Sequence, residues 1–309
     1  AYNYPKNLDK QEIKKLIVAQ TVPSLRVCFD HTAKQYLNNV RVNGISVSDS
    51  ENAWFLLGAL NGPVADFVFR RIAKPKDGGW YEANKQFIAP LPIPRAKATE
   101  KAEVAVRAKR LQELHTNRRD LLEEIARRMS AAPEKKRPDS FLFPDLAPAK
   151  ARADQAPKTL DAEHKRKWAK ASYDEELKER YAAIGERLKP GALLDAAFAN
   201  GELKFLIDGA PVLDRIFLDN ADGEFIAAQW KVIASTLNSS EHLTGEQLCR
   251  ALSKLVQTDN AALRDQIVAL QRKLAETETA IATEEEDMSW LLYRLYDLTE
   301  AEIATIRAG

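Results

Sequence analysis

The chain has 309 residues, 45% of them hydrophobic, and carries 46 Lys and Arg against 45 Asp and Glu, a formal net charge of +1. This length and apolar content suffice for a sizeable core and favour two domains over one, while the longest apolar runs fall far short of the roughly 20 residues of a membrane span. No charged-then-apolar leader opens the sequence, and its two cysteines and four singly scattered histidines predict a cytoplasmic protein without a disulfide framework or a metal site.

The charge is distributed unevenly along the chain. Residues 1–98 carry 14 Lys and Arg against 8 Asp and Glu, and residues 99–190 carry 22 against 17. Residues 191–309 reverse the balance, with 10 against 20. The basic part suits contacts with phosphates, whereas the acidic part suits a body that is held off DNA or docked on a basic partner.

The first fifty residues predict β-strands. Apolar runs at 13–19, 25–29 and 36–47 are short and are separated by polar turn residues, as is typical of strands. Asn43-Gly44 favours the positive φ angles of a two-residue turn, so we expect a β-hairpin there. The segment from Asp49 to Asn52 then provides an N-cap and an acidic first turn for a largely buried helix over the apolar residues that follow.

Basic residues and turns follow this helix. The apolar segment 64–72 ends in a cluster of cations that comprises Arg70, Arg71, Lys74 and Lys76. Asp77-Gly78-Gly79 predicts a flexible turn, and the alternating prolines of 90–94 predict an extended strand that leaves the domain.

A long helix and a compositionally biased segment come next. Between 99 and 129, apolar residues recur on one narrow face, which predicts a helix. Residues 131–160 are rich in Ala, Pro, Lys and Asp and predict a mobile linker or insertion that is held in place by Phe141-Leu142-Phe143. Residues 161–188 predict a second, highly charged helix. Both cysteines, Cys28 and Cys249, fall in patterns typical of buried strands or helices.

The acidic part of the chain predicts one hairpin and two helices. Residues 205–209 and 212–218 have the pattern of antiparallel strands. Helices are expected at 224–237 and at 244–256, where Thr244 and Gln247 are spaced for a capping box.

The clearest periodicity lies near the end of the sequence. Apolar residues follow alternating steps of four and three at positions 263, 267, 270, 274, 281, 288, 291 and 295, and Thr277 and Glu284 fill the two gaps. Such a heptad seam is typical of a self-associating coiled coil. We prefer an intramolecular pairing with the helix at 99–129 as an antiparallel two-helix stalk, because both are long and narrowly striped and a foldable segment separates them.

Two groups of motifs carry a resemblance to a known family. The first group comprises Asn52-Ala53-Trp54-Phe55-Leu56-Leu57-Gly58-Ala59-Leu60-Asn61-Gly62-Pro63, 64–71, Tyr81-Glu82, 85–88 and Leu91-Pro92-Ile93-Pro94. The second comprises 290–296 and Asp297-Leu298-Thr299-Glu300-Ala301-Glu302-Ile303. In this order they resemble the C-terminal specificity domain of TaqI-type adenine-N6 DNA methyltransferases and fused type IIG restriction enzymes, including the closing LYxLTxxEI motif. Type I specificity subunits share this architecture. The resemblance covers 13–98 and 259–309 and does not extend to 131–258.

The resemblance implies a DNA target-recognition region of a bacterial or archaeal restriction-modification system. In that family a methyltransferase domain carries a glycine-bearing cofactor loop and an Asn-Pro-Pro-Tyr or Asp-Pro-Pro-Tyr motif, and neither occurs in this sequence. We therefore expect this chain to be non-catalytic and to need no cofactor itself. S-adenosylmethionine and Mg²⁺ are implied for the parent enzyme, whose methyltransferase and nuclease domains are fused upstream or lie on a separate subunit. The start at Ala1 fits an excised piece or a processed terminus.

The expected partner is double-stranded DNA, and the candidate contacts lie in the first hundred residues. Cations that suit phosphates are Arg70, Arg71, Lys74, Lys76, Arg95 and Lys97. Polar side chains that suit base edges are Asn38, Asn39, Arg41, Asn43, Asn84, Lys85 and Gln86. Structural roles compete with these assignments, since Asn38 and Asn43 are typical turn formers and Trp80 and Tyr81 are equally suited to packing under the loop.

We accordingly expect an α+β fold in which a small mixed β-rich recognition domain is followed by long antiparallel helices. The expected segments are a recognition domain (1–98), a connecting helix (99–130), a linker or insertion (131–160), a helical region with a hairpin (161–258) and a heptad helix with a tail (259–309). Two alternatives remain. One is a nuclease activity within 131–258, for which loss of Mg²⁺-dependent cleavage on substitution of Asp208 or Asp214 would be the evidence. The other is a coiled-coil scaffold without DNA binding.

Overall fold

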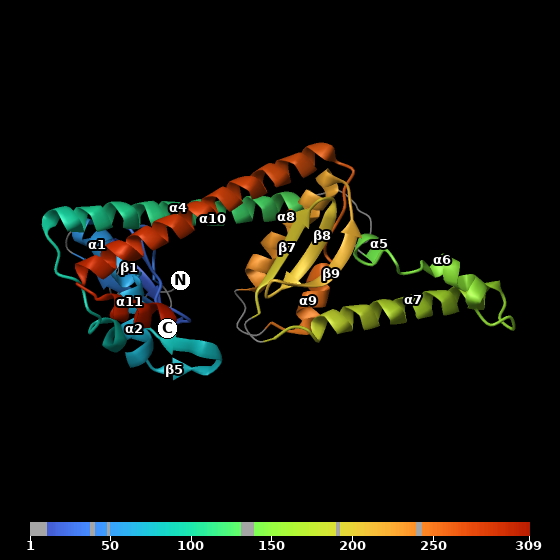
Figure 1. The fold of residues 1–309 in the computed structure, drawn as a ribbon, viewed down its shortest axis with the longest axis horizontal. Coiled ribbons are helices and arrows are strands. Elements are labelled where there is room, and N and C mark those ends of the chain that lie inside the picture. The colour runs from blue at the N-terminus through green and yellow to red at the C-terminus, as the bar shows by residue number, and fades with distance from the viewer. Residues whose placement is uncertain (1–10, 38–40, 48–49, 131–138, 190–191, 239–242) are drawn as a thin grey trace, which may run out of the picture. The chain divides into compact units, whose positions relative to one another are not determined.

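The computed structural model describes residues 11–37, 41–47, 50–130, 139–189, 192–238 and 243–309 (Figure 1). It forms two compact units. Unit 1 comprises residues 1–119 and 276–309, and unit 2 comprises 120–275. Strands form small antiparallel sheets and helices dominate the remainder, so the expected α+β class is confirmed. No helix in the described ranges is both long enough and apolar enough to cross a membrane.

Two small antiparallel sheets lie in unit 1. The first contains β1 (Lys15–Ala19), β3 (Val27–Asp30) and β4 (Val42–Ser46) in the order β3-β1-β4, and the second contains β2 (Thr21–Val22), β5 (Pro75–Lys76) and β6 (Trp80–Glu82) in the order β2-β6-β5. Leu16, Val18 and Phe29 are buried in the core beneath the first sheet. The expected strands are therefore present, although each is shorter than the apolar run that predicted it.

The helical segments of unit 1, besides its parts of the two long helices, are α1 (Ser50–Leu60), α2 (Pro63–Ile72), the 3₁₀ turn η1 (Asp77–Gly79), α3 (Lys85–Ile88) and α11 (Glu300–Ala308). Of these, α1, α2 and α3 contribute buried side chains to the core. Ala53, Phe55 and Leu57 of α1 are buried, which confirms the expected buried helix. Its predicted N-cap, Asp49, lies outside the described residues. A Cβ atom on Gly58 would lie 2.6 Å from Cγ1 of Val104, so glycine permits the close approach of α1 to the long helix that carries Val104.

Amide side chains close the outer edge of strand β3. Asn61 accepts a hydrogen bond from the Val27 N–H (2.8 Å) and donates one to the Val27 carbonyl (2.8 Å). Gln112 does the same for Phe29, at 2.7 and 3.0 Å. Two side chains thus take the place of a neighbouring strand, so this sheet edge is satisfied without a further strand.

The two long helices, α4 (Ala98–Ser130) and α10 (Ala261–Leu295), run antiparallel. In unit 1, Arg107 pairs with Glu284 at 2.7 Å and Arg118 with Glu278 at 3.0 Å, and in unit 2 Arg128 donates to Gln266. The expected intramolecular stalk is therefore confirmed.

The polar residues of the heptad seam are buried and paired. Glu284 accepts from both Arg107 and Arg110, and Thr277 accepts from Asn117 at 3.1 Å. Around them, Ile281 and Met288 are buried in unit 1 and Ile267 and Leu274 in unit 2.

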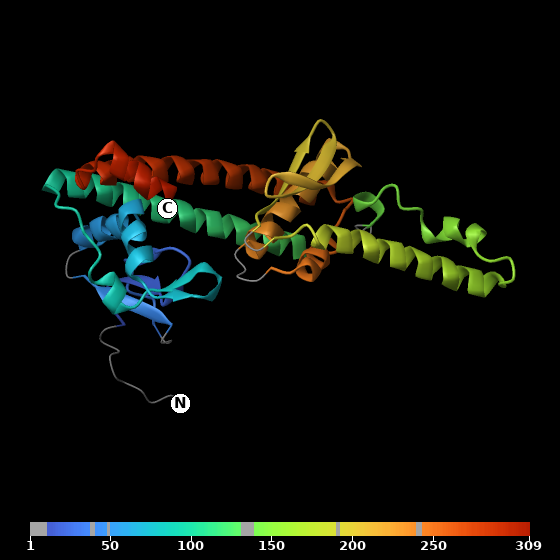
Figure 2. The same cartoon turned by 60° about the horizontal axis from the view of Figure 1, so that its bottom comes forward.

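Unit 2 is built on a three-stranded sheet in the order β7-β8-β9 (Figure 2). Its strands are β7 (Leu194–Ala199), β8 (Glu202–Ile207) and β9 (Ala210–Phe217). The predicted hairpin is confirmed as β8 and β9, whereas β7 was not predicted. Asp208 and Gly209 turn the hairpin with φ angles of 50° and 76°, and Asp208 also accepts a hydrogen bond from the Leu193 N–H (2.8 Å). Asp208 therefore has a structural role in a turn.

In the described part of unit 2, six helical segments accompany the parts of α4 and α10 that belong to it. They are α5 (Asp139–Leu142), α6 (Ala149–Arg152), the 3₁₀ turn η2 (Ala153–Gln155), α7 (Ala162–Gly185), α8 (Asn220–Leu237) and α9 (Gly245–Leu252). The capping box of Thr244 and Gln247 is present as predicted. Phe141, Leu142 and Phe143 are buried, which confirms that they hold their segment in place. Residues 139–160, expected to be a linker, contain short helices, and 131–138 lie outside the described residues.

Two local expectations for unit 1 are wrong. Asn43 and Gly44 do not form a turn, because both lie within β4 and pair with Val18 and Ile17 of β1. Residues 90–94, expected as an extended strand, contain no strand: 90 and 91 form a turn and a bend, and 92–94 have no regular secondary structure.

Candidate nucleic-acid interface

The candidate interface is centred on the hairpin of β5 and β6 in unit 1. Lys76 pairs with Trp80 across the hairpin, and Gly78 and Gly79 turn it with φ angles of 76° and 80°, which L side chains rarely adopt. The ring of Tyr81 packs edge-on against Phe69 of α2 at 6.1 Å between centroids, and Phe69 is fully buried. The hairpin is therefore anchored to the core and presents its strands to solvent. Tyr81 has a packing role, as the structural alternative expected.

A carboxylate on β6 organises the polar side chains of this hairpin. Glu82 forms an ion pair with Lys76 (2.9 Å) and accepts a hydrogen bond from the amide of Asn84 (3.2 Å). The hydrogen bond from Lys76 lowers the pKa of Glu82, and the charges of Lys76 and Lys74 contribute to this shift. Glu82 thus stays ionised and holds Lys76 and Asn84 beside the exposed Lys74.

Two arginines on the last turn of α2 are held by contacts within their own helix. Arg70 pairs with Asp66 at 2.8 Å. Arg71 stacks its guanidinium 3.2 Å from the ring centroid of Phe67 and donates to the Phe67 carbonyl at 2.9 Å. Both side chains are exposed, and each has a contact with a residue four positions earlier in its helix.

Backbone hydrogen bonds bring β4 to the same place. The Gln20 N–H donates to the Arg41 carbonyl (2.7 Å), the Ala83 N–H donates to the Gln20 carbonyl (2.7 Å), and the Asn43 amide donates to the Ala83 carbonyl (3.0 Å). Arg41 is exposed just before this strand, and Lys85 and Gln86 are exposed at the start of α3. Asn43 therefore has a structural role, while Arg41 lies near the residues that follow β6.

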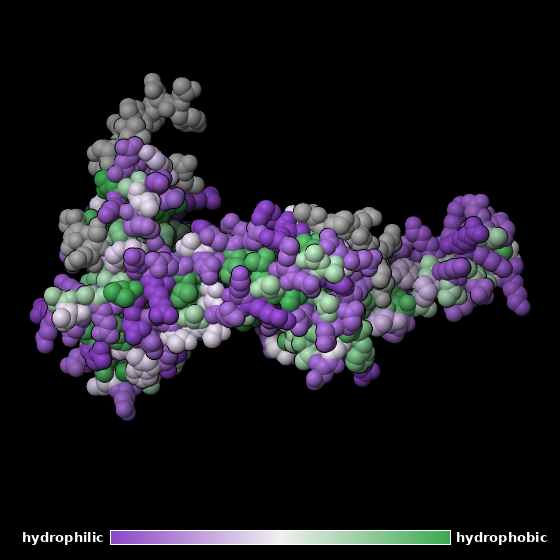
Figure 3. Space-filling view, turned by 90° about the horizontal axis from the view of Figure 1, so that it is seen from above, coloured by the Kyte–Doolittle hydropathy of each residue, from purple (hydrophilic) through white to green (hydrophobic). Residues whose placement is uncertain are grey.

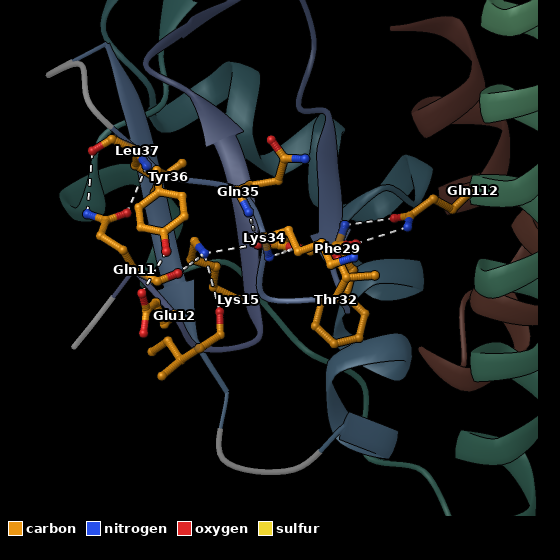
Figure 4. A network of polar contacts seen from close by, with 12 residues as sticks. Gln11, Glu12, Lys15, Phe29, Thr32, Lys34, Gln35, Tyr36, Leu37 and Gln112 are labelled. Atoms are coloured by element: carbon orange, nitrogen blue, oxygen red, sulfur yellow. Dashed lines mark hydrogen bonds and ion pairs between the residues drawn. The ribbon is translucent and has the colours of Figure 1, made fainter. Parts of the chain in front are cut away.

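A buried ion pair fixes the loop between β3 and β4 (Figure 4). Lys15 and Asp30 lie 3.0 Å apart, with exposed side-chain fractions of only 3% and 1%. Asp30 also accepts from the N–H groups of Lys34 (3.2 Å) and Gln35 (2.9 Å). Burial alone would raise the pKa of Asp30, but the hydrogen bonds from Gln35, Lys15 and Lys34 outweigh it and lower the pKa.

Two of the described contact residues that the sequence predicted, Arg95 and Lys97, are not part of this cluster. Arg95 and Lys97 are exposed just before α4, where the Lys97 N–H donates to Glu100 at 2.7 Å. Asn39 lies outside the described residues, as does Asn38. The structure thus gathers the other predicted residues around the β5–β6 hairpin, namely Arg41, Arg70, Arg71, Lys74, Lys76, Asn84, Lys85 and Gln86.

A cavity of about 450 Å³ in unit 1 was not anticipated. Its lining includes Cys28 of β3 and Arg26 just before that strand, together with His115 of α4 and Glu285 of α10. The side chains of His115 and Glu285 lie 3.3 Å apart. The hydrogen bond from His115 lowers the pKa of Glu285. These residues come from separate segments at no recognisable spacing, so no sequence signal could have identified the cavity.

The two cysteines are free thiols, as expected. Cys28, however, is exposed rather than buried, because it lies on the outward face of the edge strand β3. Within the described ranges, no group of three or more His, Cys, Asp or Glu residues could hold a metal ion. In comparisons with known proteins, no protein-family model, curated protein sequence or solved structure matches the chain significantly.

Proposed function

We propose that this chain is the sequence-specific DNA recognition region of a restriction-modification enzyme. In this proposal it places an adenine-N6 methyltransferase or endonuclease on its target site and does not catalyse either reaction. The observation that carries the proposal is the convergence of exposed cations from α2, β5, α3 and the turn before β4 around one anchored hairpin. Separate chain segments supply these cations, so their proximity is a product of the fold.

The chemistry of these side chains suits a duplex. Lys74, Lys76 and Lys85 suit the phosphates, where they release counterions and make binding salt-dependent. The stacked guanidinium of Arg71 offers a planar donor that loses little conformational freedom on binding. Arg41 and Gln86 have the donor and acceptor groups that read base edges in the major groove. Phosphate contacts would set the register and these side chains would supply the sequence preference.

The resemblance in the sequence adds support, because a contact in the structure links its two groups of motifs. Tyr296, in the closing motif, donates a hydrogen bond to the carbonyl of Pro92 in the Leu91-Pro92-Ile93-Pro94 motif at 2.7 Å. In the proposal, the methyltransferase domain supplies the S-adenosylmethionine chemistry from an upstream domain or another subunit, and Mg²⁺ belongs to its nuclease.

The scaffold alternative is weakened because the heptad seam is already engaged in contacts within the chain. Ile281, Met288 and Leu291 are buried within unit 1, and Glu284 on the same seam pairs with Arg107 and Arg110 of α4. Self-association through this seam would have to break those contacts first.

Fluorescence anisotropy with a labelled random-sequence duplex tests the proposal. We expect the chain to bind the duplex at low salt and the affinity to fall steeply as the salt concentration rises. In the variant Lys74→Glu/Lys85→Glu, the slope of log affinity against log salt should become shallower by about 2. The variant Lys34→Glu/Lys109→Glu has the same charge change on exposed side chains of unit 1 and serves as the control. Absence of binding at low salt, or equal losses in both variants, would overturn the proposal. Selection from a random duplex library then tests sequence specificity.

A further inference from the structure

A basic helical arm extends from the core of unit 2. We define the α6–α7 arm as residues 149–172, which contain α6, η2 and the first half of α7 (Figure 1). The residues of α7 that pack in the core of unit 2 all lie after the arm, and they are Tyr173, Leu177, Tyr181 and Ile184. In the arm, α7 packs against α6 and η2. The arm therefore presents most of its surface to solvent.

One buried arginine holds the arm together. Arg152 of α6 is only 8% exposed. Its guanidinium donates to the carbonyls of Ala147 (2.9 Å) and Ser172 (3.3 Å) and pairs with Glu176 of α7 (2.5 Å). These contacts fix α6 on α7, so the arm has a defined conformation and its outer charges have defined positions.

The outer surface of the arm carries an excess of positive charge. Residues 149–172 contain seven Lys and Arg and three Asp and Glu. Two of the acids are engaged locally, because Asp161 caps α7 and contacts His164 (2.9 Å) and Glu163 pairs with Lys167 (2.8 Å). The exposed cations that remain on the arm are Lys150, Lys158, Arg166 and Lys170. Figure 3 accordingly shows this end of unit 2 as mainly hydrophilic.

We propose that the α6–α7 arm binds the phosphate backbone of double-stranded DNA as a second contact surface, independent of the hairpin in unit 1. The proposal rests on the proposed function. The first eleven residues of α7 span about 16 Å, since a helix rises about 1.5 Å per residue. A duplex presents one negative charge per about 1.7 Å of its axis, so it can contact cations distributed along the whole arm at once. The side chains that remain after local pairing are cations and not base-reading amides, which favours contact with phosphates over bases.

Charge reversal on the arm is the direct test, using the full chain and a random-sequence duplex. The arm variant is Lys158→Glu/Arg166→Glu/Lys170→Glu. The control variant, Lys178→Glu/Lys189→Glu/Lys254→Glu, has the same charge change on exposed residues of unit 2 outside the arm. We expect the arm variant to bind about tenfold or more weakly at low salt and its dependence of log affinity on log salt to become shallower by about 2 to 3, while the control changes little.

A local probe reports on the arm directly. Trp168 lies on the arm and is 37% exposed. We expect its fluorescence to change when the duplex binds, and this component to be lost in Trp168→Phe, which keeps the charge of the arm. Circular dichroism of the arm variant checks that α7 remains folded.

The outcomes separate the two proposals. If the hairpin variant loses affinity and the arm variant behaves like its control, the arm proposal is overturned and the DNA-binding function stands. If the arm variant loses affinity and the hairpin variant does not, the arm proposal holds and the assignment of the hairpin fails. If the arm variant lost affinity for DNA and for poly-glutamate equally, the arm would bind any polyanion. That result would overturn the assignment of double-stranded DNA as its partner.

Discussion

The hydroxyl of Tyr296 donates a 2.7 Å hydrogen bond to the carbonyl of Pro92, across 204 positions of sequence. Pro92 lies in the segment that leads into α4, and Tyr296 follows the last residue of α10. The bond therefore ties the beginning of one long helix to the end of the other, within unit 1. Burial raises the pKa of Tyr296 far above its ordinary value, so the hydroxyl remains a donor throughout the physiological pH range.

Removing the hydroxyl of Tyr296 tests how much its hydrogen bond to Pro92 contributes to stability. We expect Tyr296→Phe to lower the free energy of unfolding by about 1 kcal/mol, because it leaves a partly buried carbonyl without its donor. Chemical denaturation measures the change. Tyr36→Phe is the matched control, since it removes a hydroxyl whose partner, Glu12, lies at an exposed site. Equal stabilities of Tyr296→Phe and the wild type would show that solvent replaces this bond fully.

The buried pair of Lys15 and Asp30 makes stability depend on pH. Because folding lowers the pKa of Asp30, its contribution is complete above the ordinary pKa of 3.8 and disappears as the pH falls through the lower value of the folded state. We expect Asp30→Asn to cost about 3 to 5 kcal/mol at pH 7, since Lys15 would be buried without its counter-charge. The difference between the free energies of unfolding of the wild type and the variant, measured with urea, should become smaller below pH 4. A gap independent of pH in this range would contradict the ion pair.

Turn dipeptides show why local sequence predicted only part of the fold. Asn-Gly at 43–44 was expected to turn a hairpin, yet the same dipeptide forms a turn at 200–201, with φ angles of 53° and 78° between β7 and β8. At 43–44 the flanking segment pairs with β1 over five residues, and the Asn43 side chain bonds to Ala83. Tertiary pairing thus overrode the turn preference at one site and agreed with it at the other. Long-range periodicity was more reliable, since the heptad seam predicted α10 and its antiparallel partner.

The candidate site was predictable in composition but not in arrangement. Exposed cations near 70–76 were evident from charge alone, and most of the predicted residues lie around the hairpin. Arg95 and Lys97 do not, because they lie just before α4. Their separation from the hairpin in space could not be predicted from their separation along the chain. The sequence did not predict the α6–α7 arm as a basic surface, because acidic residues in the same segment reduce its net charge. The structure shows that some of these acids are paired locally, such as Glu163 with Lys167.

Asn61 tests whether an amide side chain is needed to close the edge of β3. We expect Asn61→Ala to lower the free energy of unfolding by about 1 to 3 kcal/mol, because both backbone groups of Val27 lose their partner. Hydrogen exchange of the Val27 amide should accelerate more than that of Phe29, which Gln112 still protects. In unit 2, Asn238 makes the corresponding pair of bonds to Leu194, at 2.9 and 3.1 Å. Asn238→Ala should therefore leave Val27 exchange unchanged, and acceleration at Val27 there would contradict a local role for Asn61.

Arg152 tests whether the arm of unit 2 is held by its buried guanidinium. We expect Arg152→Ala to release α6 from α7, because the variant removes three anchoring contacts and leaves the Ala147 carbonyl without its donor. Limited proteolysis should then cut within 149–161 faster than in the wild type, while cleavage within the β7–β8–β9 sheet stays unchanged. Arg180→Ala is the control, since Arg180 also pairs with Glu176 but lies in the second half of α7, outside the arm. Equal cleavage of the arm in both variants would mean that the Glu176 ion pair, and not the position of Arg152 on α6, sets its stability.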